Sequence, residues 1–424
     1  MTTRFASVAT CLLCLLCSSG TVRADDSAPD DPASNSQFAW KMFVQAMQTT
    51  SSGGLVFESW QEQCQINPAM PGCPTNLPAA ADGKRARTLH ASPLARRLAA
   101  QNPKLKALVT VNGIECNAMN TFGLPVTNYP APPLYPPPAN VTATAQFCEE
   151  VYANPPEVTF ITQNNLQTLT GQATYGQSHG NAITLPASSI EVKADWVPTS
   201  SFANPTFQCP DPTGSLYTET INGTCYALVG LHLSSKARPD WVWATFEPAS
   251  AVTNPNRCDP KLYSMCFDPW GTTSTTPYGK DKAAGVKPSA ALLAVMKSAN
   301  LNKAFANYYL TGVQTQFVGA QGKPVMLGSS FVEYNAGVSQ LQASCITCHK
   351  YAYYDGKPPP AGVPEDNFGG APSGWANVGW ACNANPQTQN CTPVTAPPPT
   401  ATSQDFSWLL GLMPAGSSNA PAPH

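Results

Sequence analysis

Residues 225–246 read CYALVGLHLSSKARPDWVWATF, and this stretch decides the fold class of the chain. Its two ends are rich in Val, Leu and aromatic residues, and the polar segment between them contains Lys, Arg, Pro and Asp. Such apolar runs, bounded by turn-forming residues, predict β-strands. In the second run Trp241 and Trp243 lie on one face of the expected strand, while Val242 and Ala244 lie on the other. We therefore expect this region to contribute a sheet core.

The strand pattern extends over residues 157–250, whereas helical spacing appears on both sides of it. The expected strands are 157–162, 183–196, 225–233 and 241–246. The expected helical pieces are 36–48, 84–106 and 288–310, with a short helix in 339–354 and a last turn or two in 405–412. A hairpin is expected around residues 319–323, and the sequence predicts loops in the Pro-rich segments 124–139 and 355–402.

The composition excludes one broad function class. Only 11% of the 424 residues are charged, against roughly 25% in ordinary soluble domains, and the formal net charge is −2. A protein that binds nucleic acid by electrostatics needs a large positive excess, which this chain lacks. Basic residues are nevertheless concentrated in 84–106, which holds seven Lys or Arg and no acid. This segment is either a solvated cationic face or a surface that steers an acidic partner.

The first residues have the pattern of a secretory signal. Arg4 precedes a short apolar run from Phe5 to Cys17, and Val22-Arg23-Ala24 is a small-x-small cleavage site. The expected signal peptide is residues 1–24, with cleavage after Ala24; an uncleaved anchor is the alternative. No later segment offers 18 continuous apolar residues, so we expect a periplasmic or secreted protein without a membrane span.

Cysteine usage agrees with export. Twelve of the 15 cysteines lie after the expected signal, and two of these belong to the motif discussed next. The other ten form five successive local pairs, which predicts disulfides in an oxidising compartment; buried thiols are the alternative. In chain order they are Cys64, Cys73, Cys116, Cys148, Cys209, Cys225, Cys258, Cys266, Cys382 and Cys391.

Residues 345–349, Cys-Ile-Thr-Cys-His, carry the chemistry. C-x-x-C-H is the attachment signature of c-type haem. The spacing suits it, because two thiols one turn apart can reach two vinyl groups and the next residue can ligate the iron. We therefore expect one covalent haem c on Cys345 and Cys348, with His349 as the proximal ligand. Zinc would need four ligands, a thioredoxin-like pair would need a βαβ context, and a Cys345–Cys348 disulfide would be strained.

The second axial ligand is open at the sequence level. Met413 is the only Met after the motif and precedes a Pro, so it ranks first. His232 is the alternative, because on a strand its side chain points away from Leu231 and Leu233. Met326, His179 and an open iron are further alternatives. The tryptophans at 241 and 243 are candidates for a pocket wall, with Arg238 or Lys236 near a propionate.

With this motif the chain resembles a monohaem c-type cytochrome. Several segments also resemble large exported monohaem proteins of bacteria, namely residues 38–40, 57–60, 190–196, 230–232, 241–247 and 405–407. The resemblance implies covalent haem and periplasmic redox work, with a redox protein or enzyme as the partner. It names no substrate. Small cytochromes pack helices around the haem, and residues 355–402 lack them.

Three functions follow as expectations. The first is a periplasmic electron carrier, with no nucleic acid and no membrane span, and with an oligomeric state that the sequence leaves open. The second is a haem enzyme that performs peroxide or oxygen chemistry, with His232 or Glu333 as an acid–base group; no catalytic residue is assigned. The third is a recognition protein with an accessory haem.

The expected fold class is α+β. An antiparallel β-rich region, stapled by disulfides, would be joined to a small helical, loop-rich haem-binding region. The expected domains are a β-rich domain with N-terminal helices at 25–280 and a c-type haem-binding region with Pro/Gly-rich loops at 281–424.

Overall fold

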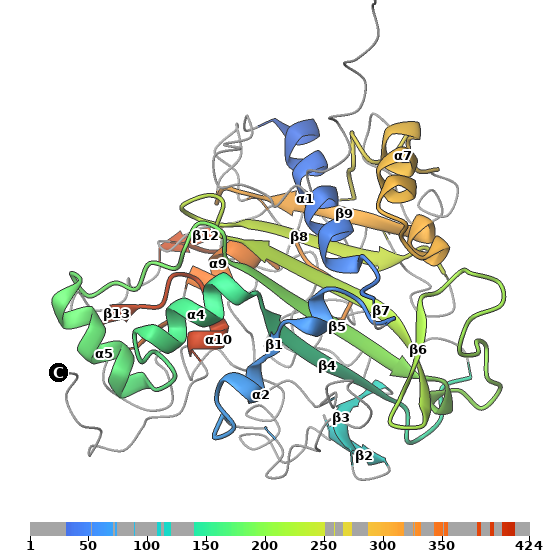
Figure 1. Cartoon of the computed structure of the whole chain (residues 1–424), viewed down its shortest axis with the longest axis horizontal. Coiled ribbons are helices and arrows are strands. Elements are labelled where there is room, and N and C mark those ends of the chain that lie inside the picture. Colours follow the sequence, from blue (N-terminus) through green and yellow to red (C-terminus); the bar gives the residue numbers. More distant parts are fainter. Residues whose placement is uncertain are drawn as a thin grey trace, which may run out of the picture.

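An antiparallel sheet forms the centre of the fold in the computed structural model (Figure 1). The structure describes residues 31–51, 53–70, 73, 89, 108–111, 114–119, 140–250, 258, 266–273, 287–317, 325, 327–331, 343–350, 352–354, 380–382, 391–393 and 401–411. Within these residues the sheet has nine strands in the order β2-β3-β4-β5-β7-β8-β9, with β1 paired to β4 and β6 to β7. They are β1 (Gln61–Glu62), β2 (Leu108–Val111), β3 (Ile114–Ala118), β4 (Gln146–Ala153), β5 (Ile190–Pro198), β6 (Thr218–Ile221), β7 (Thr224–Ser235), β8 (Val242–Pro248) and β9 (Tyr308–Gln314).

Helices lie against this sheet, and the chain is α+β, as the sequence predicts. The described α-helices are α1 (Pro32–Met47), α2 (Gln63–Ile66), α4 (Pro155–Gln163), α5 (Leu169–Ser178), α7 (Ala290–Ser298), α9 (Cys345–Lys350) and α10 (Trp408–Gly411). Two small antiparallel sheets pair β10 (Tyr353–Tyr354) with β13 (Thr402–Ser403), and β11 (Trp380–Cys382) with β12 (Cys391–Pro393).

The two apolar runs of residues 225–246 form the antiparallel pair β7–β8. Their register places Leu231 opposite Phe246 and His232 opposite Thr245. Side chains alternate between faces along a strand. As predicted, Val242 and Ala244 enter one core cluster while Trp241 and Trp243 enter the other. The pair therefore sets the two faces on which the rest of the chain packs.

The first face of the sheet is covered by α1 and α7 (Figure 1). Leu231, Leu233 and Phe246 point into this core, and the rings of Trp40 and Phe43 from α1 lie 4.9 and 4.6 Å from the Phe246 ring. Fully burying one such side chain stabilises the fold by about 1.5–3 kcal/mol. The helix predicted at 36–48 is thus confirmed, and its apolar face is what attaches it to the sheet.

The second face is covered by four helices. Its core joins Trp243 of β8 to Ile161 of α4, Leu169 of α5, Ile346 of α9 and Leu410 of α10. Because both faces are covered, the central strands are buried almost throughout and lack the alternation of a half-exposed strand. The second face is therefore where the Cys-x-x-Cys-His helix meets the sheet.

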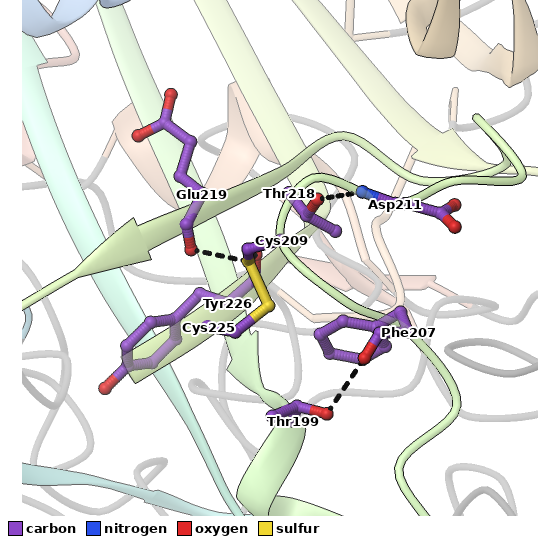
Figure 2. Close-up of a disulfide and its surroundings, with 8 residues drawn as sticks. All are labelled: Thr199, Phe207, Cys209, Asp211, Thr218, Glu219, Cys225 and Tyr226. Atoms are coloured by element: carbon purple, nitrogen blue, oxygen red, sulfur yellow. Dashed lines mark hydrogen bonds between the residues drawn. A yellow bond between two sulfur atoms is a disulfide. The ribbon is translucent and has the colours of Figure 1, made fainter. Parts of the chain in front are cut away.

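Four of the five predicted disulfides are confirmed: Cys64–Cys73, Cys116–Cys148, Cys209–Cys225 and Cys258–Cys266. Figure 2 shows the Cys209–Cys225 bond, which ties the loop ahead of β6 to the start of β7. In that loop Thr199 Oγ1 donates to the Phe207 carbonyl at 3.2 Å, and Asp211 N–H donates to Thr218 Oγ1 at 2.8 Å. Cys382 and Cys391 are register partners in β11–β12, but their side chains lie outside the described residues.

The strand predicted at 157–162 is wrong, because these residues belong to α4. Val, Thr, Phe and Ile suggested a strand, but the local start signals favour a helix. Asn154 caps the helix, its side chain accepting from Glu157 N–H at 3.4 Å, and Pro155 and Pro156 occupy the first turn. A cap followed by proline therefore outweighs β-branched composition here.

The long helix predicted at 288–310 is also only partly right. The α-helix ends at Ser298, and Asn300 then adopts a left-handed φ of 51°. A short 3-10 turn over Lys303–Asn307 leads into β9, which pairs with β8. Asn tolerates this backbone conformation better than most residues, so it ends the helix as a glycine would.

Some of the remaining predicted elements are present in the described residues, and others fall outside them. The strand expected at 183–196 begins later, at Ile190, while the short helix in 339–354 is α9 and the last turn in 405–412 is α10. The segment 84–106, apart from Leu89, and most of the expected hairpin around 319–323 lie outside the described residues. The central sheet continues across residue 280, since β9 is paired with β8. No helix in the described part of the chain is long and apolar enough to cross a membrane.

Candidate functional site: the helix of the Cys-x-x-Cys-His motif

Helix α9 is held against the second face of the sheet from its first turn. Ile346 is fully buried in the core of that face. Gln314, the last residue of β9, fixes the start of the helix. Its Oε1 accepts from Ile346 N–H at 3.0 Å, and its Nε2 donates to Ser344 Oγ at 3.0 Å and to the Val325 carbonyl at 2.6 Å. The sheet edge thus determines where the motif begins.

The two cysteines of the motif lie one helical turn apart. Residues at i and i+3 share a face of a helix, so Cys345 and Cys348 point to the same side. Both are thiols, Cys345 buried and Cys348 partly exposed. The Cys345 thiol donates to the Leu327 carbonyl at 3.3 Å. This arrangement suits two thioether bonds to one flat group lying along the helix.

His349 has a defined tautomer. Its Nδ1 lies 2.8 Å from the carbonyl oxygen of Phe406. A carbonyl only accepts hydrogen bonds, so Nδ1 carries the proton and Nε2 keeps its lone pair for a metal. Burial is the main cause that holds the pKa of His349 well below its usual range, followed by the nearby His232. The imidazole is therefore neutral at pH 7, the form that ligates iron.

His232 lies in the middle of β7 and is 4% exposed. Its Nδ1 is 3.1 Å from Thr245 Oγ1 across the β7–β8 pair, and its Nε2 has no hydrogen-bond partner among the described residues. Burial, and secondarily the charge of Lys193, lowers the pKa of His232 to about 3. As the sequence predicts, the His232 side chain points to the other face of β7 from Leu231 and Leu233. It is buried there as a neutral imidazole.

The structure brings His232 and His349 together, with Trp243 beside them. The imidazole ring centres are 6.1 Å apart, and Trp243 lies 4.2 Å from His349 and 5.9 Å from His232. Metal–imidazole bonds of about 2 Å give two trans imidazoles ring centres about 6 Å apart, so the spacing alone suits two ligands of one iron. Trp243 packs beside both rings and is closer to His349 than to His232. His232 is therefore a neighbour of His349 in the buried cluster.

Other candidate ligands lie elsewhere or outside the described residues. His179 is exposed, stacks on Tyr175 with ring centres 3.7 Å apart, and takes no part in this cluster. Met413, Met326 and Glu333 lie outside the described residues, so Met413 stays a prediction.

The basic residues considered as propionate partners already have protein partners. Lys236 Nζ lies 2.6 Å from Asp405 Oδ1, and Arg238 Nη2 donates to Asn35 Oδ1 at 3.1 Å. Trp241 and Trp243 stack with ring centres 5.9 Å apart, and Trp243 Nε1 donates to the Asp240 carbonyl at 3.0 Å. The tryptophans therefore line the motif helix, whereas the two cations serve the fold.

Sequence analysis missed a pair of buried carboxyl groups close to this cluster. Glu157 of α4 and Glu191 of β5 are both buried, and Glu191 accepts from Ser407 Oγ at 2.5 Å. Burial first, and the charge of Glu191 second, raise the pKa of Glu157 well above its usual range. Neither residue belongs to a motif, and only the tertiary fold brings them together.

The residues at α9 fit a covalently bound haem. Two thiols share one helix face, an imidazole presents an unprotonated Nε2, and a buried aromatic cluster adjoins them. Among the described residues, those of α9 included, no three His, Cys, Asp or Glu side chains are grouped to hold a metal ion. Comparisons with family models, curated proteins and solved structures found no match to this chain.

Proposed function

We propose that this protein is an exported monohaem c-type cytochrome that transfers electrons in the periplasm, as the partner of a redox enzyme or redox protein. The observation that carries the proposal is the hydrogen bond from His349 Nδ1 to the Phe406 carbonyl. In a chance Cys-x-x-Cys-His sequence nothing requires the histidine to be buried, neutral and held in the tautomer that leaves Nε2 for iron. Bound haem supplies a one-electron couple at the iron.

Each residue of the motif has a separate task. The thiols of Cys345 and Cys348 would hold the haem by adding across its two vinyl groups; each addition would form a C–S bond, break the S–H bond and place the hydrogen on the other vinyl carbon. No oxidant or leaving group is needed. His349 supplies Nε2 to the iron, and Ile346 and Gln314 hold the helix on the sheet. Trp243 and Phe406 exclude water from one side of the imidazole.

Export is supported by the disulfides. Four bonds are formed by described cysteines, and such bonds persist in oxidising compartments. Covalent haem attachment belongs to the same side of the membrane. The expected signal peptide at residues 1–24 would deliver the chain there. A haem enzyme acting on peroxide or oxygen is the alternative function, and it would need an iron coordination position open to a small ligand.

The attachment is tested by intact mass. The protein is co-produced with a cytochrome c maturation system, and we expect its mass to exceed that of the polypeptide by one haem, which survives acid–acetone extraction. Replacement of either Cys345 or Cys348 by Ala should leave at most one thioether, and the double replacement should abolish covalent haem. Covalent haem in the double variant would contradict the assignment.

A matched control separates attachment from folding. The pair Cys258→Ala/Cys266→Ala also removes two cysteines, but these form a disulfide away from the motif. This control should keep its covalent haem. For the choice between carrier and enzyme, the ferrous protein is exposed to carbon monoxide. A carrier with a saturated iron keeps its spectrum, whereas rapid binding together with peroxide turnover would favour the enzyme.

A further inference from the structure

We propose that Asp405 is a positioning residue that fixes the proximal ligand His349 and thereby lowers the reduction potential of the haem. The inference rests on the proposed function, since it concerns the same iron site. It is built on the turn at residues 405–406, whose carbonyl receives the His349 Nδ1 proton. Nothing in the sequence around Asp405 signals this role, because the contact joins residues 57 positions apart.

The turn has an unusual backbone. Asp405 and Phe406 have φ values of 52° and 65°, two successive left-handed residues, and neither is glycine. Such a conformation costs about 1–3 kcal/mol at each residue, and it persists only where the surroundings enforce it. The side chain of Asp405 supplies that enforcement, because both of its oxygens are used to tie the turn to other elements.

The partners of Asp405 come from two separate loops. Oδ2 accepts from the N–H of Leu185, which lies ahead of β5, at 2.7 Å. Oδ1 accepts from Nζ of Lys236, which lies in the turn between β7 and β8, at 2.6 Å. Lys236 is itself fixed, since Nζ also donates to the Pro239 carbonyl at 2.7 Å. The ion pair is largely buried, with side chains 10% and 7% exposed.

The residues on either side of Asp405 also connect the turn to its surroundings. We call these contacts, together with those of the Asp405 side chain, the Asp405 clamp. Gln404 N–H donates to the Ala352 carbonyl at 3.0 Å. This bond joins the turn to the segment that follows α9. Ser407 Oγ donates to Glu191, which joins it to β5. The Lys350 ammonium lies over the Phe406 ring, 4.5 Å from the ring centre. The Phe406 carbonyl is therefore held in a fixed relation to His349.

A fixed acceptor at Nδ1 changes the metal ligand. A hydrogen bond from the second ring nitrogen orients an imidazole and increases its basicity, so that more electron density reaches the metal. This favours ferric iron over ferrous iron and lowers the reduction potential. If Asp405 is changed, the turn relaxes, the hydrogen bond to Phe406 weakens, and the potential rises.

Paired variants distinguish positioning from simple electrostatics. Asp405→Asn removes a negative charge and Lys236→Met removes a positive one, and both break the clamp. Positioning predicts that the potential rises in both variants, whereas a through-space charge effect predicts shifts of opposite sign. Lys236→Arg keeps the ion pair and should return the potential toward the wild-type value. Glu149→Gln breaks the Lys193–Glu149 pair on the sheet and is the control for loss of an ion pair.

The measurements are potentiometric titration and proton NMR of the ferric haem methyl groups, whose shifts report the orientation of the proximal ring. We expect the methyl pattern to change in Asp405→Asn and Lys236→Met but not in Glu149→Gln. Opposite potential shifts, or an unchanged methyl pattern with a folded protein, would overturn the inference. Should Asp405→Asn fail to fold, the Lys236 pair of variants decides alone. Absence of covalent haem in the wild type would instead refute the proposed function.

Discussion

Single side chains in the buried cluster are expected to control how stability depends on pH. In the folded protein the pKa of Glu157 is raised well above its usual range, chiefly by burial. Its contribution to stability is complete below the pKa of an unfolded glutamic acid, and it is lost as the pH rises toward the folded pKa. Glu157→Gln stays neutral and should remove this loss.

The free energy of unfolding, measured by urea titration at a series of pH values, should therefore fall less steeply with pH in Glu157→Gln. The difference in slope should reach about 1.4 kcal/mol per pH unit, the value for one proton. Glu219→Gln on β6, far from this cluster, is the control and should follow the wild type. A parallel decline in Glu157→Gln and the wild type would show that Glu157 is ionised in the folded state.

The second axial ligand is also a question of single side chains. Because Met413 ranks ahead of His232 as the second axial ligand, we expect His232→Ala to keep the low-spin spectrum. Met413→Ala should make the iron high-spin, abolish the weak near-infrared sulfur–iron band and lower the reduction potential, since a thioether favours ferrous iron. Optical and EPR spectra of both ferric variants provide the measurement, with exposed His179→Ala as the control. A high-spin His232→Ala with an unchanged Met413→Ala would assign His232 instead.

Among the elements, the β6–β7 hairpin and its preceding loop depend on the Cys209–Cys225 bond (Figure 2). The bond closes a loop with a sequence separation of 16, for which chain entropy predicts about 3 kcal/mol of stabilisation. Cys209→Ala/Cys225→Ala should lose about that much unfolding free energy in urea titrations under oxidising conditions. A variant as stable as the oxidised wild type would contradict the estimate of loop entropy.

Elements whose signals are local were predictable from sequence, and elements decided by distant contacts were not. Helix α1 and strands β7 and β8 follow from their apolar periodicity, and the disulfides follow from the consecutive spacing of cysteines. The helix at 155–163 was missed because its residue types favour strands while its cap favours a helix. β9 was missed because it pairs with β8 from some sixty positions further along the chain.

The same distinction holds for the site. The motif Cys345, Cys348 and His349 is readable from spacing alone, and so is the face on which His232 lies. The carbonyl of Phe406, the Asp405 clamp and the Glu157–Glu191 pair are not, since each depends on segments that only the tertiary fold brings together. The sequence therefore identified the residues proposed to attach haem but missed those that hold His349 in place.

At the scale of the whole molecule, the sheet joins what the sequence suggested as two parts. β9 lies beyond residue 280 and pairs with β8, and Gln314 at its end anchors α9. Hydrogen bonds from Gln314 thus connect the start of the motif helix to the sheet. The strands and the helices on both faces form the layers against which the motif helix packs.

The order of the cysteines along the chain has a consequence for biogenesis. Every described disulfide joins a cysteine to the next one in sequence, and all four lie ahead of Cys345. A chain threaded through a membrane from its N-terminus can therefore close each bond as the second partner emerges, before the motif thiols reach the oxidant. Once these bonds have formed, none of those eight cysteines is left as a thiol that could be oxidised into a disulfide with Cys345 or Cys348. In an oxidising compartment this linear order would therefore favour two reduced thiols at the motif.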